Sequence, residues 1–237
     1  MIMLKILKQD LKRTRGTSTV VVLFVALAAL LMAGGVGLVA ELAGSLDAMF
    51  RAARAPDVVQ MHAGSVDAEE LFAWGTRSPA VQEMQIQEMV TVDGSALRVG
   101  KGAGSEAESV MDISFVTQND SFDFLLDETN APALISPGEV GVPVYYAARE
   151  GLGIGDPVEL TWQGGTRRLR ISTFIRDAQM NPAIVHSKRF LVHEEDFALL
   201  GGRFPEREYL ITFRLEESEE SDAFIATYQA TELPQKG

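Results

Sequence analysis

The chain of 237 residues contains no cysteine and only three histidines, His62, His186 and His193. The absence of cysteine excludes disulfide bonds, thiolate metal ligands and a cysteine nucleophile. His193 precedes three acidic residues at a predicted helix start, where the positive end of the helix dipole explains the acids without a metal ion. We therefore predict no metal-binding residues.

The sequence also lacks the short motifs that accompany common enzymatic chemistry. It has no Gly-x-Ser-x-Gly, His-Glu-x-x-His or Ser-x-x-Lys pattern. The glycines at 151, 153 and 155 precede a proline and a predicted strand, whereas a phosphate-binding glycine loop opens a helix. We predict that the protein is not an enzyme and has no catalytic residues and no cofactor-binding residues.

One run of acidic residues could in principle bind calcium, because carboxylates are calcium ligands. Asp120, Asp123, Asp127 and Glu128 lie close together in the sequence. They lack the alternating spacing and the central glycine of a calcium-binding loop. The run is therefore predicted to form a solvated acidic face.

Positive charge is scarce after the N-terminus. Five of the 21 Lys and Arg residues and only two of the 33 acidic residues precede Gly44, which leaves 16 cations against 31 acids and a net charge of −15 from Gly44 onward. Such a charge repels phosphate backbones. A nucleic-acid partner is therefore not expected.

The strongest positive signal is an apolar run of 21 residues, Val20–Ala40, without a charged side chain. A helix of this length spans roughly 30 Å, the hydrocarbon thickness of a bilayer. Cations precede the run and acids follow it, so the positive-inside rule predicts a cytoplasmic N-terminus and an extracytoplasmic main domain at a bacterial cell membrane. A cleaved signal peptide is the alternative, although its apolar core is usually shorter, at about 7 to 15 residues.

The chain is predicted to divide into four parts. A basic cytoplasmic elbow occupies 1–18, a transmembrane helix 19–41, a stalk helix 42–56 and an extracytoplasmic domain 57–237. The stalk is predicted from helical spacing of apolar residues that continues until Pro56. Within the membrane run, a stripe of small residues is formed by Ala29, Ala33 and Gly37. Two explanations are open: the stripe arises by chance, or it allows close contact with another transmembrane helix.

The region after Pro56 alternates between strand and helix patterns. Turn signals at Asp93-Gly94 and Gly164-Gly165 each predict a β-hairpin. Intermixed hairpins and helices predict an α+β domain that is long enough to form either one or two subdomains. Strands are predicted at 57–62, 81–92, 96–99, 158–162, 168–175, 190–192 and 209–215, and helices at 67–74, 143–147, 194–200 and 218–230.

A basic elbow, one apolar helix, a stalk and a mixed domain, in this order, resemble the N-terminal part of an FtsX-like or MacB-like ABC transporter permease. The specific likeness lies in the turn and strand Gly151–Leu160 and the return strand Leu169–Asp177. The resemblance implies partners: the lipid bilayer, a separate ABC ATPase subunit, and further permease helices or a second permease copy. It implies a domain that couples ATP-driven motion to export or to an envelope partner.

Permeases of this family continue into three more transmembrane helices, whereas this sequence ends with residues 233–237 before any such helix. Under this resemblance we expect a truncated permease or a fragment of one. The alternative is a complete single-pass, membrane-anchored binding or sensor module.

Overall fold

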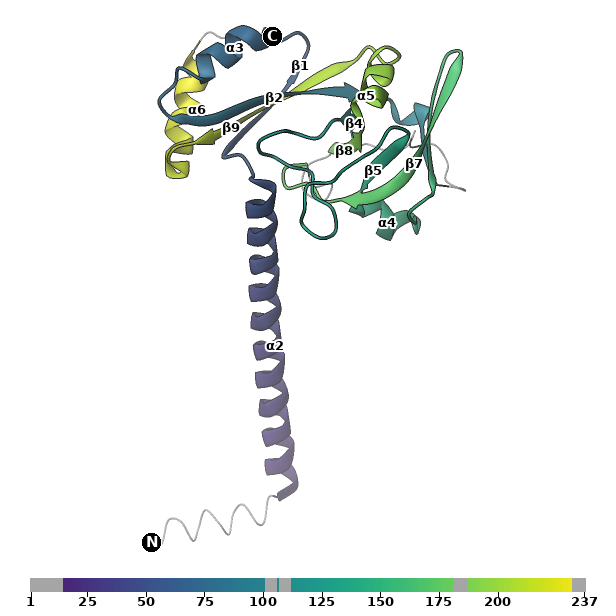
Figure 1. Cartoon of the computed structure of the whole chain (residues 1–237). Helices are drawn as coiled ribbons and strands as arrows, with labels where there is room; N and C mark the ends of the chain where they lie inside the picture. The colour runs from purple at the N-terminus through teal and green to yellow at the C-terminus, as the bar shows by residue number, and fades with distance from the viewer. Residues whose placement is uncertain (1–14, 101–105, 107–111, 181–186, 232–237) are drawn as a thin grey trace. The chain divides into compact units, whose positions relative to one another are not determined.

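Figure 1 shows the computed structural model of the chain, which describes residues 15–100, 106, 112–180 and 187–231. The predicted elbow up to residue 14, the glycine-rich loop at 101–105 and His186 lie outside the described residues. The chain divides into two units, Met1–Ala48 and Met49–Gly237. Each unit is described by itself.

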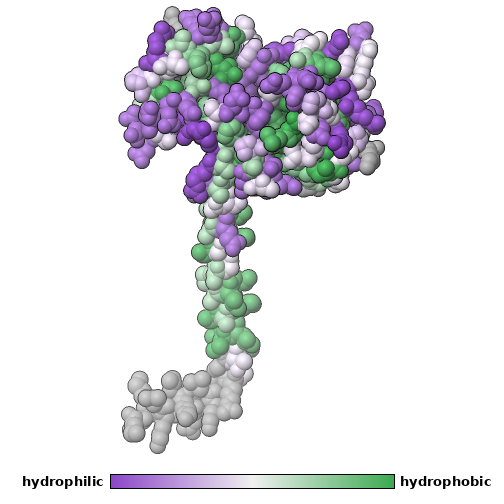
Figure 2. Space-filling view, in the orientation of Figure 1, coloured by the Kyte–Doolittle hydropathy of each residue, from purple (hydrophilic) through white to green (hydrophobic). Residues whose placement is uncertain are grey.

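Helix α2 (Arg15–Ala53) accounts for the described part of the first unit and extends into the second. Hydrophobic side chains cover the visible face of the helix over most of its length (Figure 2). Its segment Thr19–Ala53 is long and apolar enough to cross a membrane, a test that a signal sequence near the N-terminus also passes. The predicted continuation of the helix beyond Glu41 is confirmed, and the helix ends three residues before Pro56.

The strands of the second unit form one mixed sheet of nine strands, in the order β1-β9-β2-β4-β8-β5-β7-β6-β3. Strand β4 runs parallel to β8 and β5 runs parallel to β7, whereas the other pairs are antiparallel. The strands are β1 (Val58–Ala63), β2 (Val81–Thr91), β3 (Leu97–Val99), β4 (Asp112–Val116), β5 (Glu139–Pro143), β6 (Pro157–Trp162), β7 (Gly165–Ile175), β8 (Ser187–Val192) and β9 (Arg207–Leu215).

Short helices connect the strands. They are α3 (Ala68–Gly75), η1 (Gly94–Ala96), α4 (Val144–Glu150), α5 (Glu194–Gly201), η3 (Ser218–Glu220) and α6 (Ser221–Ala230). Local sequence explains several of their ends: the Asp67 side chain accepts a hydrogen bond from the Glu70 N–H at the start of α3, and Gly151 ends α4 in the left-handed conformation. This mixture of helices and strands agrees with the predicted α+β class. The prediction also allowed two subdomains, but the strands form a single sheet.

The sheet carries separate cores on its two faces. On one face, α3 and α6 cover β1, β9 and the first half of β2, as Figure 1 shows, and Trp74 packs there against Phe213 and Tyr228. A larger core with Tyr146 and Phe190 continues on the same face toward β6. The opposite face is covered by the segments 117–135 and 176–180, which contribute buried side chains such as Leu125.

The structure corrects one predicted hairpin and confirms the other. Strands β6 and β7 pair across Gly164, which has a φ of 92°. By contrast, β2 and β3 do not pair, because η1 follows Asp93 and directs the chain away, so that β3 pairs with β6 at the far edge of the sheet. Strands β4 and β5, which lie inside the sheet, were not predicted from the sequence.

Candidate functional site

The C-terminal end of α2 closes with a Schellman motif. The N–H of Ala55 donates to the carbonyl of Phe50 over 3.0 Å, and the N–H of Arg54 donates to the carbonyl of Arg51 over 3.1 Å. Arg54 has a φ of 48°. Glycine usually occupies this left-handed position because a side chain there costs about 1 to 2 kcal/mol. A long cation at such a position suggests that its side chain has a role.

The last carbonyl groups of the helix are bonded by the domain rather than left to solvent. The carbonyl of Ala53 accepts from the N–H of Phe124 over 2.9 Å, and the carbonyl of Arg54 accepts from the N–H of Asp123 over 3.1 Å. The side chain of Ala53 is fully buried. Because the final carbonyls of a helix have no partner within it, these two bonds make the helix end part of the domain.

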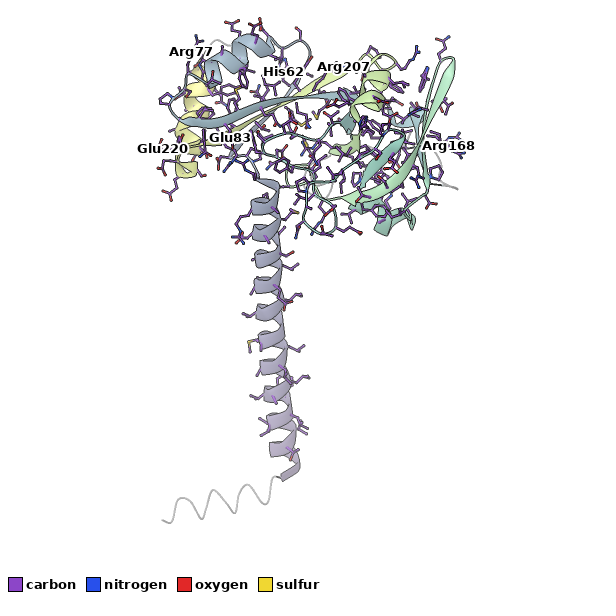
Figure 3. The ribbon with its side chains drawn as sticks, in the orientation of Figure 1. His62, Arg77, Glu83, Arg168, Arg207 and Glu220 are labelled. Atoms are coloured by element: carbon purple, nitrogen blue, oxygen red, sulfur yellow. The ribbon has the colours of Figure 1, made fainter. Side chains whose placement is uncertain are left out.

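The guanidinium of Arg54 strengthens this junction. It donates to the carbonyl of Ser121 over 2.5 Å and to Glu83 over 2.7 Å. Glu83, labelled in Figure 3, also accepts from Arg214 over 2.7 Å. The Arg54 and Glu83 side chains are 44% and 29% exposed, so the pair contributes about 1 kcal/mol or less. Its main effect is to hold the helix end against both β2 and the loop at Ser121.

A buried ion cluster anchors the loop that receives the helix. We call it the Arg189 cluster, and it comprises Arg189, Asp123, Asp177 and Gln87. Arg189 binds Asp177 through two bonds of 2.6 and 2.7 Å, and it donates to Asp123 and Gln87 over 2.9 Å each. The Arg189 side chain is fully buried. Asp123 therefore bonds the helix end through its backbone and the centre of the sheet through its carboxylate.

The two carboxyl groups of the cluster titrate differently. Burial raises the pKa of Asp123, which the charge of Arg189 only partly counteracts. Burial acts in the same direction on Asp177, but Arg189 and two backbone N–H groups outweigh it and leave the pKa of Asp177 below its ordinary value. Among the described residues, no hydrogen bond reaches the Oδ1 atom of Asp123. Asp123 is thus the less stabilised carboxylate of the two.

A second buried cation lies on the other face of the same strand. Lys188 donates to Glu106 over 2.9 Å and to the Tyr146 hydroxyl over 3.0 Å, and Tyr146 also donates to Glu106 over 3.0 Å. Burial and the neighbouring carboxylate raise the pKa of Tyr146. We call this group the Lys188 cluster. Tyr146 places this cluster within the larger core, on the face of the sheet opposite to the loop that receives α2.

The residues considered as ligands from the sequence are dispersed in the structure. The Nε2 atom of His62 lies 3.2 Å from the carbonyl of Ser65, and the Nδ1 atom of His193 accepts from the Glu195 N–H at the start of α5. Asp196, buried in the first turn of α5, pairs with Arg167. Within the described ranges, no three acidic or histidine side chains group as a metal site.

The predicted solvated acidic face is wrong for Asp123. Asp120 is exposed, and Asp127 caps a turn by accepting from the N–H of Thr129 over 2.7 Å. Asp123 is 1% exposed because Arg189, which lies 66 residues further along the chain, meets it in the interior. Local spacing cannot reveal a partner at that separation.

The sequence does contain one signal for the buried clusters. Lys188 and Arg189 directly precede the apolar strand residues Phe190–Val192. Adjacent side chains of a strand face opposite sides of a sheet, so two cations beside a buried run predict a buried acid on each face. The junction at Arg54 has no comparable signal.

The candidate functional site is assigned from the geometry of the structure rather than from comparisons with known proteins. No protein-family model matches the chain, and no curated protein matches it in sequence. The site that stands out is therefore the junction at the end of α2, which we define as Arg54, Glu83, the loop 121–124 and the Arg189 cluster. Its bonds connect a helix end to the middle of a sheet.

Proposed function

We propose that this chain is the N-terminal part of an ABC transporter permease of the FtsX-like or MacB-like kind. In this proposal α2 crosses a bacterial cell membrane with its N-terminus in the cytoplasm. The second unit lies outside the cytoplasm and takes no part in chemical catalysis. It couples the ATP-driven motion of a separate ATPase subunit to export or to an envelope partner.

The helix itself supports the membrane part of the proposal. Its segment Val20–Ala40 carries no charged residue, and the side chains along it are exposed. Exposed apolar side chains on every face of a helix are stable in a hydrocarbon environment and costly in water. The cations before the run and the acids after it favour the proposed orientation.

The junction carries the coupling part of the proposal. Helical conformation runs from Arg15 to Ala53 without a break. The carbonyls of Ala53 and Arg54 are then bonded by the loop at Asp123, which Arg189 anchors to β8. A displacement of the helix end would act directly on the interior of the domain, because close-packed interiors transmit strain.

The proposed orientation can be tested because the chain has no native cysteine. Ser65 is exposed, so Ser65→Cys provides a single accessible thiol. An impermeant thiol reagent should label this variant on intact cells. Labelling only after lysis would show that the second unit lies inside.

The coupling role is tested by breaking α2. Ala48→Pro removes a helical hydrogen bond and clashes with the preceding turn, at a cost of about 3 kcal/mol or more, whereas Ala48→Ser is tolerated. Both variants are assembled into the complete permease with its ATPase. Hydrogen exchange at residues 121–124 should respond to a non-hydrolysable ATP analogue with Ala48→Ser but not with Ala48→Pro. An equal response in both variants would disprove coupling through the helix.

A further inference from the structure

Strand β2 has a free edge in the middle of the sheet. Strand β9 pairs with it along Val81–Val90, whereas β4 pairs with its other edge only at Val90 and Thr91. No other described strand pairs with the rest of that edge. Unpaired N–H and C=O groups along a strand are a template for pairing with another extended chain.

The sheet opens between β2 and β4 because the segment that follows β4 turns away from β2. If the antiparallel register continued, Asn119 would face Ile86. Instead, the side chain of Gln87 fills the gap and donates to the carbonyl of Thr117 over 2.9 Å and to Asn119 over 2.7 Å. At the other end of the gap, Arg54 bridges Glu83 and the loop. Side chains thus bridge both ends and leave the strand edge between them uncovered by a strand.

A groove of about 810 Å³ lies along this edge. Helix α3 forms one wall with Ala68, Phe72 and Thr76, the segment Met84–Ile86 of β2 forms the second, and Asp120 and Ser121 border the third side. Phe72 is 48% exposed although it is a large apolar side chain. The eight residue steps from Ala68 to Thr76 rise about 12 Å, the length of roughly four residues of a β-strand.

The negative charge of the groove favours a positively charged occupant. Glu69 and Asp120 are exposed at the groove, and none of the described residues that line it is a Lys or Arg. The residues from Gly44 onward carry a net charge of −15. A second copy of this domain would bring the same negative charge, whereas a basic segment would be attracted.

We propose that the groove binds an extended segment of a partner protein, with alternating apolar and basic side chains, by adding a strand to β2. The apolar side chains face α3 and Phe72, and the basic side chains face Asp120. The backbone of the segment pairs with the free edge, which is the recognition mode of β-strand addition. Because Arg54 bridges one end of the gap, the bound segment lies beside the junction at the end of α2.

The assignment of this segment to an envelope partner rests on the proposed function, whereas the binding itself does not. The test uses the full chain in detergent micelles, without an ATPase, so failure to bind leaves the coupling test unaffected. The probe is a fluorescein-labelled hexapeptide of alternating valine and lysine. Matched controls replace lysine with glutamate or methylate alternate backbone nitrogens, which removes the donors needed for strand pairing.

Binding is measured by fluorescence anisotropy and by hydrogen exchange at residues 83–89. The valine–lysine peptide should bind, should slow exchange on β2, and should bind at least about tenfold more tightly than either control. Phe72→Ser and Asp120→Lys should each weaken binding at least about tenfold. Leu134→Ser, which changes another highly exposed apolar residue, should leave binding and exchange unchanged.

Three results would overturn the proposal. The first is a valine–lysine peptide that binds no better than its glutamate counterpart. The second is binding that survives both backbone methylation and Phe72→Ser. The third is a dimer of the chain, detected by sedimentation, that Phe72→Ser dissociates, because the occupant would then be a second copy. Unchanged urea unfolding of Phe72→Ser confirms that lost binding does not reflect lost folding.

Discussion

Lys188 and Arg189 are neighbours on β8 with fully buried side chains, yet they face different parts of the domain. Lys188 meets Glu106 within the larger apolar core. Arg189 meets two carboxylates, and one of them, Asp123, belongs to the loop that receives the helix end. Two cations of equal burial can therefore differ in whether they only stabilise the fold or also hold a junction.

Arg189→Met should have the largest effect, because it removes the shared partner of two buried carboxylates. Loss of one partner from a buried ion pair typically costs about 3 to 5 kcal/mol. Urea unfolding of the full chain in detergent, followed by the fluorescence of Trp74 and Trp162, should show this loss. Hydrogen exchange at residues 121–124 should accelerate in mild urea, before global unfolding. Unchanged exchange there would separate the cluster from the junction.

Lys188→Met sharpens the comparison because it makes the same change one residue earlier. Glu106 would lose its cation but keep the hydroxyl donor of Tyr146, so we expect a loss of about 2 to 3 kcal/mol. Exchange at residues 121–124 should stay at the wild-type rate under conditions where the fold is intact. Equal acceleration in both variants would mean that the two faces are not distinct.

Arg54→Asn is expected to cost about 1 kcal/mol or less, because the guanidinium is partly exposed and Asn tolerates the left-handed backbone. Its effect should be local, with faster exchange of the Asp123 and Phe124 amides and little change in the urea midpoint. Arg51→Asn is the control, since Arg51 is exposed in the same last turn. Similar exchange in the two variants would argue against a clamp at Arg54.

Asp123→Asn should have the smallest effect at neutral pH. Its folded pKa is raised above the ordinary value of 3.8, so its stabilising contribution is present at acidic pH and is lost as the pH rises through the folded pKa. Asparagine keeps an oxygen for Arg189, so the urea midpoint at pH 7 should hold or rise, and its decline above pH 3.8 should flatten.

Asp177→Asn is the matched control for this prediction. The pKa of Asp177 is lowered, so its contribution is present above its ordinary pKa and is lost only as the pH falls through the folded pKa. Asp177→Asn should therefore lower the urea midpoint at pH 7. Equal losses in the two variants would show that the carboxyl groups are equivalent.

Features with local causes could be predicted from the sequence. The capping carboxylate of Asp67, the left-handed Gly151 and the turn at Gly164 act on residues a few positions away. The helices at 67–74 and 143–147 and the hairpin at Gly164 were accordingly predicted close to where the structure has them. The turn at Asp93 shows the limit of such signals. The Asp93 side chain does accept from the Ser95 N–H over 2.8 Å, but the strand that follows pairs with β6 instead of β2.

The sequence by itself determined the long apolar helix, its continuation toward Pro56, the mixed α+β composition and the charge asymmetry. Each depends on periodicity, propensity or charge along a short stretch of chain. Only the tertiary structure decided the strand order, the burial of Asp123 beside Arg189, the docking of the Ala53 carbonyl and the free edge of β2. These features join residues that are distant in sequence, and their energies depend on desolvation and packing that exist only once the chain has folded.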